Sequence, residues 1–120
     1  MIGSEFAGIY QAFVSEVTVV EALPRMMGTL DQEVVEVLKD QFVASGIRVL
    51  ENTKVEEITQ VGENLKVTMN GPQGVLSVVA EKVLLSIGRS PYTKGLGLET
   101  IDIVTDRGAI KVDPGPWKPL

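Results

Sequence analysis

Apolar residues near the start of the chain recur every three or four positions, which is the spacing of one face of a helix. They are Ile2, Phe6, Ile9, Tyr10 and Phe13. Small residues lie between them and keep part of the surface free of bulk, namely Gly3, Ala7 and Gly8. The pattern predicts a helix that lies very close to a neighbouring sheet.

A strand and a second helix are expected next. The β-branched run at residues 17–20 is too short for a helix and predicts a buried strand that ends at Glu21. Residues 29–32 then fit a capping box that begins at Thr29. The helix after it should end at Gly46, which suits a left-handed helix stop. Its apolar face consists of Val34, Val35, Leu38 and Phe42.

The hydrophobic period drops to two in the second half of the chain. Residues 48–50 predict a short strand, and the alternation within residues 54–80 predicts an inserted β-meander. The nearly continuous apolar run at residues 82–87 stops at Gly88. Such a run predicts a strand that is buried on both faces and returns to the main sheet.

The end of the chain is expected to contribute a hairpin and a tail. A turn at residues 105–108 predicts the hairpin. Residues 114–120 carry three prolines, which cannot continue a helix or a central strand. We therefore expect one domain at residues 1–113, followed by an extended proline-rich tail at residues 114–120.

Composition narrows the function classes. The 120 residues include no cysteine and no histidine, which excludes disulfides, thiol nucleophiles, Cys/His metal sites and imidazole catalysis. The formal charge is −5 and no basic cluster stands out, so nucleic acid is a poor partner. No apolar run is long enough to cross a membrane and the start does not resemble a secretion signal, so a cytoplasmic protein is expected.

The order helix, strand, helix, strand, meander, strand is the outline of an α/β, doubly wound, Rossmann-like nucleotide-binding domain that lacks its first central strand. The residues resemble the pyridine nucleotide-disulfide oxidoreductases, and among these the dihydrolipoamide dehydrogenases most closely. Residues 1–7 resemble the end of that family's Gly-x-Gly-x-x-Gly loop, and residues 83–91 are similar to its strand ending in Ile-Gly-Arg-x-Pro. Residues 19–21, 50–55 and 106–113 continue the resemblance in the same order.

The resemblance implies an NAD site. Gly3 would be the third glycine of the fingerprint, in a first helical turn formed by Met1, Ile2, Gly3, Ser4 and Glu5, whose amides face the pyrophosphate. Glu5 would lie near the nicotinamide. Glu21 would accept hydrogen bonds from the adenosine ribose and repel the 2′-phosphate of NADP. Val55 would lie against the adenine, and Gly88 beside the dinucleotide.

Taken singly, these residues have simpler explanations. Gly3 alone is a helix-terminus glycine, Glu21 a solvated strand end, Val55 a core residue and Gly88 a turn. These residues occur together, within motifs that follow the order of the family's motifs, and this favours the family resemblance over the separate explanations.

The chain also departs from the family pattern. The family's redox dithiol lies in its FAD domain and its acid-base histidine in its interface domain, so we expect no catalytic residue, no metal site and no FAD in this chain. FAD and the reaction belong to the full-length parent, which would be a homodimer, and the chain is expected to be truncated at both ends. Two alternatives stay open. One is another NAD-linked flavoprotein, such as a mercuric or coenzyme A-disulfide reductase, and the other is a non-catalytic fragment that self-associates through open sheet edges.

Overall fold

The computed structural model describes residues 1–112 and residue 115. The chain divides into two compact units, Met1–Ser86 and Ile87–Leu120. Apart from Gly115, the expected tail at residues 114–120 lies outside the described residues. The fold of each unit is therefore considered separately.

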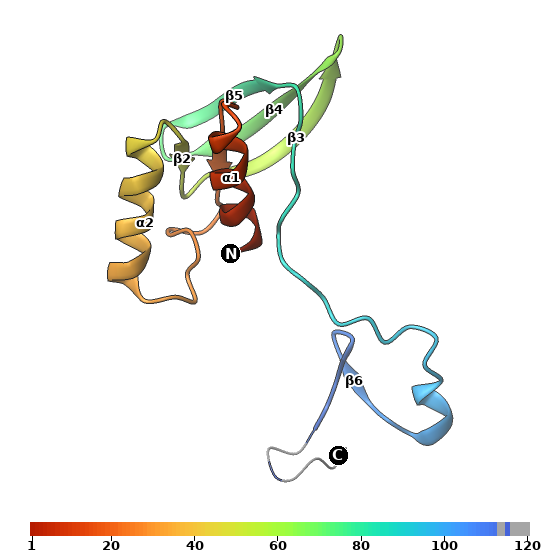
Figure 1. Ribbon diagram of the computed structural model, residues 1–120. Helices are drawn as coiled ribbons and strands as arrows, with labels where there is room; N and C mark the ends of the chain where they lie inside the picture. The colour runs from red at the N-terminus through yellow and green to blue at the C-terminus, as the bar shows by residue number, and fades with distance from the viewer. Residues whose placement is uncertain (113–114, 116–120) are drawn as a thin grey trace. The chain divides into compact units, whose positions relative to one another are not determined.

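The first unit opens with two helices and a pair of parallel strands (Figure 1). In chain order these are α1 (Ile2–Ala12), β1 (Thr18–Val20), α2 (Gln32–Ala44) and β2 (Arg48–Leu50). The two strands pair in parallel, with Val19 opposite Val49. Each helix runs antiparallel to the strand that follows it, so the first turns of both helices lie at the same end as the carboxyl ends of β1 and β2 (Figure 1). This is the Rossmann-like arrangement that the order of elements in the sequence predicts.

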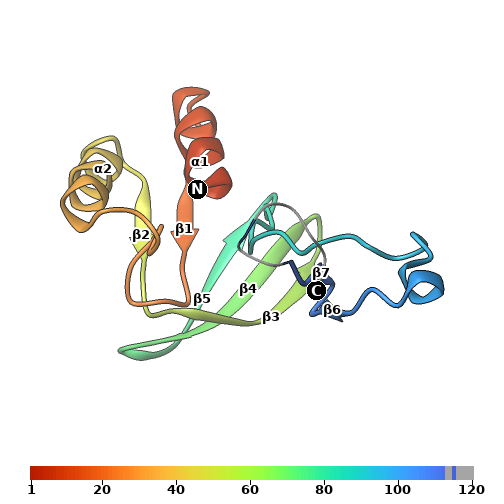
Figure 2. The same ribbon diagram turned by 90° about the horizontal axis from the view of Figure 1, so that it is seen from below.

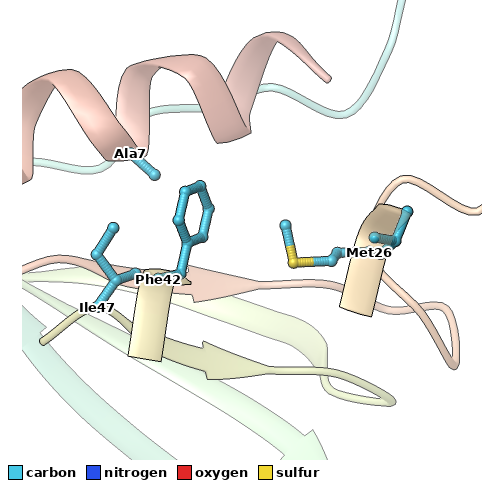
Figure 3. Packing of buried hydrophobic residues seen from close by; sticks show 5 residues of the cluster. Ala7, Met26, Phe42 and Ile47 are labelled. Atoms are coloured by element: carbon cyan, nitrogen blue, oxygen red, sulfur yellow. The ribbon is translucent and has the colours of Figure 1, made fainter. Parts of the chain in front are cut away.

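The main core lies where the two helices meet the strand pair (Figure 3). Ala7 points from α1 toward the ring of Phe42 on α2. The buried members of this core are Ala7, Met26, Val35, Phe42 and Ile47. Val19 and Val49 pack against them from β1 and β2, and Val17 from the residue before β1. All of β1 is half-buried, which corrects the expectation of a buried strand.

Helix α1 packs through its small residues and not through its large ones. Ala7 is the buried residue of the helix, whereas Phe6 is 39% exposed and Phe13 is 78% exposed. Among the large side chains, Phe6 and Tyr10 stack on each other with ring centroids 6.0 Å apart. Gly3 makes a close approach, but to Ser86, which lies outside the described sheets, and not to a strand as expected. A two-stranded sheet is narrow and covers only one stripe of the helix, so most of the apolar pattern remains exposed.

Helix α2 begins later than the capping box predicted. Asp31, not Thr29, is the N-cap, and its carboxylate accepts the N–H groups of Glu33 at 2.9 Å and Val34 at 3.5 Å. Aspartate is as good a cap as threonine or better, which explains the shift. The predicted stop is confirmed, since Gly46 has a φ of +91° directly beyond the last turn.

Three antiparallel strands occupy the range predicted for the meander. They are β3 (Lys54–Val61), β4 (Asn64–Gly71) and β5 (Gly74–Ala80), with β4 in the centre (Figure 2). The central strand β4 supplies the buried side chains Val67 and Met69, whereas the residues of β3 and β5 are more exposed. The meander therefore packs as a small sheet with one covered face.

The strand predicted at residues 82–87 is not formed. Within the described part of the chain this segment makes no backbone hydrogen bond, and Leu85 is 72% exposed. A strand requires a hydrogen-bonded neighbour, and β1 pairs only with β2 in the described sheets. Residues 82–87 therefore do not pair with the free edge of β1, and the segment lies outside the described sheets.

The second unit contains a short 3₁₀ helix and the predicted hairpin. The helix η1 spans Leu98–Ile101, and β6 (Thr105–Asp106) pairs antiparallel with β7 (Ala109–Ile110). The two residues between these strands, Arg107 and Gly108, have φ values of +50° and +84°. Positive φ at both positions is the geometry of a two-residue hairpin turn, which explains the Arg-Gly pair there.

Candidate functional site

Two carboxylates, Glu21 and Glu51, follow the carboxyl ends of the adjacent parallel strands β1 and β2. The N–H of Glu21 donates to the carbonyl of Leu50 at 2.8 Å, and the N–H of Thr53 donates to the carbonyl of Glu21 at 2.9 Å. These bonds continue the β1–β2 ladder past the strand ends. In open parallel sheets this end is where ligands bind.

Glu21 keeps part of its carboxylate free. Its side chain is half-buried, and Oε1 accepts the N–H of Leu23 at 2.9 Å. No donor among the described residues binds Oε2. A carboxylate with one oxygen fixed and the other open is an oriented acceptor for hydroxyl donors.

The first turn of α1 lies at the end of the strand pair where β1 and β2 finish (Figure 1), and Glu21 directly follows β1. The N–H groups of Ser4 and Glu5 donate to the carbonyl of Met1 at 3.0 and 3.2 Å. The N–H groups of Ile2 and Gly3 precede any acceptor within the helix and remain open. Open amides and the helix dipole make this turn favourable for negative charge, and Glu5 is exposed within it.

Gly3 is in close contact with residue 86. A Cβ built at Gly3 would lie 3.2 Å from the Cβ and 3.3 Å from the Oγ of Ser86. Such distances are too short for an undisturbed side chain, so a glycine lets the helix approach this segment.

The remaining predicted site residues lie in other elements. Val55 is 40% exposed on β3, opposite Met69 and two residues beyond Thr53. Gly88 belongs to the second unit and has a φ of +118°, which L side chains rarely adopt. The structure thus places the first turn of α1 at the end of the strand pair that Glu21 follows. Gly88 belongs to the other compact unit and is described only within it.

Sequence reasoning did not select Glu51 as a site residue. Its Oε1 accepts the N–H of Met26 at 2.8 Å, and its Oε2 forms an ion pair with the Nζ of Lys39 on α2. Burial alone would raise the pKa of Glu51, but Lys39, the Met26 amide and Arg25 together hold that pKa below its ordinary value. One signal was available, because Glu51 follows Leu50 as Glu21 follows Val20, each directly after a parallel strand.

A solvent-open hollow of the first unit lies beside Glu51, and Glu21 is not among its lining residues. It has a volume of about 540 Å³ and is open to solvent. Its lining includes Leu23, Pro24, Arg25, Gln32, Glu36, Lys39 and Glu51. None of the predicted site residues lines this hollow, so it is a separate feature of the α2 side.

Two further findings concern sites and location. The described residues hold no group of three or more aspartate, glutamate, histidine or cysteine side chains that could bind a metal ion. No helix in the described part of the chain has the length and apolar character needed to span a membrane.

The sequence model of the family described as pyridine nucleotide-disulphide oxidoreductase matches residues 1–116. This match covers most of the chain, and the chain belongs to that family. Similar curated relatives include dihydrolipoyl dehydrogenases. The enzyme of that name from Mycobacterium tuberculosis is 38% identical over 113 residues, which is 93% of this chain and 24% of the relative. A dihydrolipoamide dehydrogenase from Chaetomium thermophilum is 38% identical over 117 residues, covering 94% of this chain and 23% of the relative.

Solved structures support the same assignment. The crystal structure of LpdA from Mycobacterium tuberculosis matches with a TM-score of 0.76 and 33% identity, over 89% of this chain and 23% of that one. The flavoprotein disulfide reductase RclA from Escherichia coli matches with a TM-score of 0.78 and 30% identity, over 93% of this chain and 25% of that one. The chain thus spans about a quarter of the length of these relatives.

Proposed function

We propose that this chain supplies NAD(H)-binding residues of a dihydrolipoamide dehydrogenase-like flavoprotein, which transfers electrons between a dithiol/disulfide and NAD through FAD. The observation that carries the proposal is the half-open carboxylate of Glu21 directly after β1, at the end of the strand pair where the first turn of α1, with the open amides of Ile2 and Gly3, lies. A dinucleotide needs both an acceptor for its ribose hydroxyls and donors for its pyrophosphate.

The fit of the residues to NAD follows from their chemistry. Glu21 would accept the ribose hydroxyls of the adenosine, and the first turn of α1 would face the pyrophosphate. Gly3 fits this role because the space that a Cβ would fill is already taken by Ser86. Val55 would contact the adenine, Glu5 would lie near the nicotinamide, and Gly88 would leave room for the dinucleotide.

The same chemistry predicts a preference for NAD over NADP. A 2′-phosphate beside Glu21 would place like charges together, and repulsion at short range in a partly buried site is strong. The first basic side chain in the sequence is that of Arg25. The two Arg25 hydrogen bonds given by the structure go to the backbone carbonyls of Gly28 and Leu30, so this guanidinium is already engaged.

Calorimetric titration of the 120-residue chain with NAD and with NADP tests the proposal. We expect saturable binding of NAD and weaker binding of NADP. Glu21→Arg should narrow or reverse the preference, and Glu21→Gln should weaken NAD binding. Glu16→Gln is the control, because Glu16 is exposed and precedes β1 at its other end. Equal affinities of the unmodified chain for NAD and NADP would remove Glu21 as the ribose ligand.

The isolated chain is proposed to be inactive toward dihydrolipoamide. It contains no cysteine to exchange electrons with the substrate and no histidine to move protons. FAD and the reacting groups would belong to the rest of the parent protein, which we propose is a homodimer. Another NAD-linked disulfide reductase is an alternative parent, since RclA is also similar to this chain.

A second candidate function is self-association without cofactor binding. The observation that favours it is the free edge of β1, which pairs only with β2 in the described sheets. Open strand edges are templates for pairing with another chain. Concentration-dependent association in light scattering, together with no heat of NAD binding, would favour this candidate over the first.

A further inference from the structure

The turn that begins at Glu21 is tied to residues 50–53 by four hydrogen bonds. Three are backbone bonds, in which Glu21 donates to Leu50, Thr53 to Glu21 and Asn52 to Leu23, at 2.8, 2.9 and 3.0 Å. The fourth is different, because its acceptor is the side chain of Glu51, which binds the N–H of Met26 at 2.8 Å. Glu51 is therefore the side chain that holds the far end of this turn.

Met26 makes this hydrogen bond important. Its side chain is 2% exposed and belongs to the main core, so the backbone at residue 26 cannot turn its N–H to solvent without moving the side chain. Glu51 itself is held in place, since Lys39 pairs with its other oxygen and its side chain is only 13% exposed. The turn is thus anchored by an apolar side chain and by a fixed carboxylate.

The anchored turn also controls Glu21. The Glu21 Oε1 accepts the N–H of Leu23, and the carbonyl of Leu23 accepts the N–H of Asn52, so the orientation of the Glu21 carboxylate follows the path of the turn. If the Met26 end were released, residues 22–26 would gain freedom and the direction of the open Glu21 oxygen would be lost. Orientation of an acceptor is a large part of its contribution to binding.

We infer that Glu51 is a positioning residue for Glu21, which sets ribose recognition through the turn at residues 21–26 without contacting the nucleotide. The inference rests on the proposed function, because it assumes that Glu21 binds the ribose. It adds a residue from the neighbouring strand end to the determinants of NAD selectivity. It also assigns a role to the acceptor oxygen that faces Met26, as distinct from the ion pair with Lys39.

A double-mutant cycle on the 120-residue chain tests the inference, with calorimetric titrations of NAD and NADP. Glu51→Ala should weaken NAD binding by about tenfold and lower the NAD/NADP preference. In a chain that already carries Glu21→Gln, Glu51→Ala should change the NAD affinity very little further, because the Glu21 carboxylate that Glu51 positions is already absent. Additive effects of the two substitutions would overturn the inference.

Two variants separate positioning from a general loss of structure. Glu51→Gln keeps an acceptor for the Met26 N–H and should retain most of the NAD preference, even though the ion pair with Lys39 is lost. Glu36→Ala is the matched control, since Glu36 lines the same hollow and accepts from Gln32 within its own helix. It should leave both affinities unchanged. Thermal melts establish that each variant is folded at the titration temperature.

The outcomes distinguish the two proposals. If the unmodified chain does not bind NAD, the proposed function fails and this inference fails with it. If it binds NAD and NADP equally, Glu21 is not the ribose ligand and this inference is overturned. If the chain prefers NAD but Glu51→Ala keeps the full preference, only the positioning role of Glu51 is wrong. If Glu51→Gln is as damaging as Glu51→Ala, the acceptor oxygen is not the determining group and the inference is overturned.

Discussion

Gly3 lies so close to Ser86 that a Cβ at position 3 would come within 3.2 Å of the Ser86 Cβ. The contact joins the first turn of α1 to the segment at residues 82–86, which has no backbone hydrogen bonds within the described part of the chain. Gly8 lies on the same helix, and a Cβ there would meet nothing within 4 Å. The two glycines therefore have different roles.

Alanine substitutions should separate these roles. Gly8→Ala should raise the free energy of unfolding by about 0.5–1 kcal/mol, because alanine is the better helix former and has room. Gly3→Ala should give no such gain, since the new methyl group must displace Ser86. Urea unfolding followed by circular dichroism measures both, and an equal gain at both positions would contradict the close contact.

The start of α2 can be tested by comparing two caps. Asp31→Ala should destabilise the chain by about 0.5–2 kcal/mol, because two N–H groups lose their acceptor. Thr29→Ala should have an effect within about 0.5 kcal/mol, as is usual for surface positions without a special role. The same unfolding measurement checks both variants. A larger effect at Thr29 than at Asp31 would place the cap where the capping-box pattern put it.

Acid should weaken the first unit through Glu51. Because the folded pKa of Glu51 is lowered, its contribution to stability is present above the ordinary carboxyl pKa of about 4.3 and is lost as the pH falls through the folded value. The charged groups around it are Lys39 on α2 and Arg25 in the turn, with Glu36 lining the same hollow.

Thermal melts from pH 6 down to pH 2 measure this dependence. The difference in melting temperature between the unmodified chain and Glu51→Gln should be largest near neutral pH and should shrink in acid. A difference that stays constant across this range would mean that the Glu51 charge does not contribute.

The open edge of β1 leads to a prediction about pairing. Adding an apolar strand that ends in Gly-x-Gly before Met1 should provide β1 and residues 82–87 with a common neighbour. The melting temperature and the NAD affinity should both rise, because sheet bonds and phosphate-facing amides are gained together. Self-association should fall, since the edge is then covered.

Light scattering, thermal melting and NAD titration on the two proteins check this prediction. A control extension of the same length with glycine and serine should have no such effect. If the 120-residue chain is already a stable monomer with undiminished NAD affinity, the edge of β1 needs no further strand.

Local patterns in the sequence were sufficient for most elements of the fold. The period of two over residues 54–80 corresponds to β3, β4 and β5, and the stop at Gly46 and the turn at Arg107–Gly108 follow from backbone preferences of single residues. The order of the motifs was sufficient for the family, and the β-branched run at residues 17–20 predicted the strand end at Glu21. All of these depend on neighbours along the chain, which the sequence contains in full.

The tertiary structure decided what depends on distant partners. The apolar residues at 82–87 have the composition of a buried strand but form none, because a strand exists only when another strand offers it hydrogen bonds. The helical spacing of the apolar residues corresponds to α1, which ends at Ala12, yet Ala7 faces the core while Phe6 and Phe13 stay exposed. In the sequence alone, Glu51 is an ordinary charged residue at a strand end. The fold places the Met26 N–H against one of its carboxylate oxygens and the Lys39 Nζ against the other. Its role depends on residues 25 and 12 positions away along the chain, and no local pattern specifies such a contact.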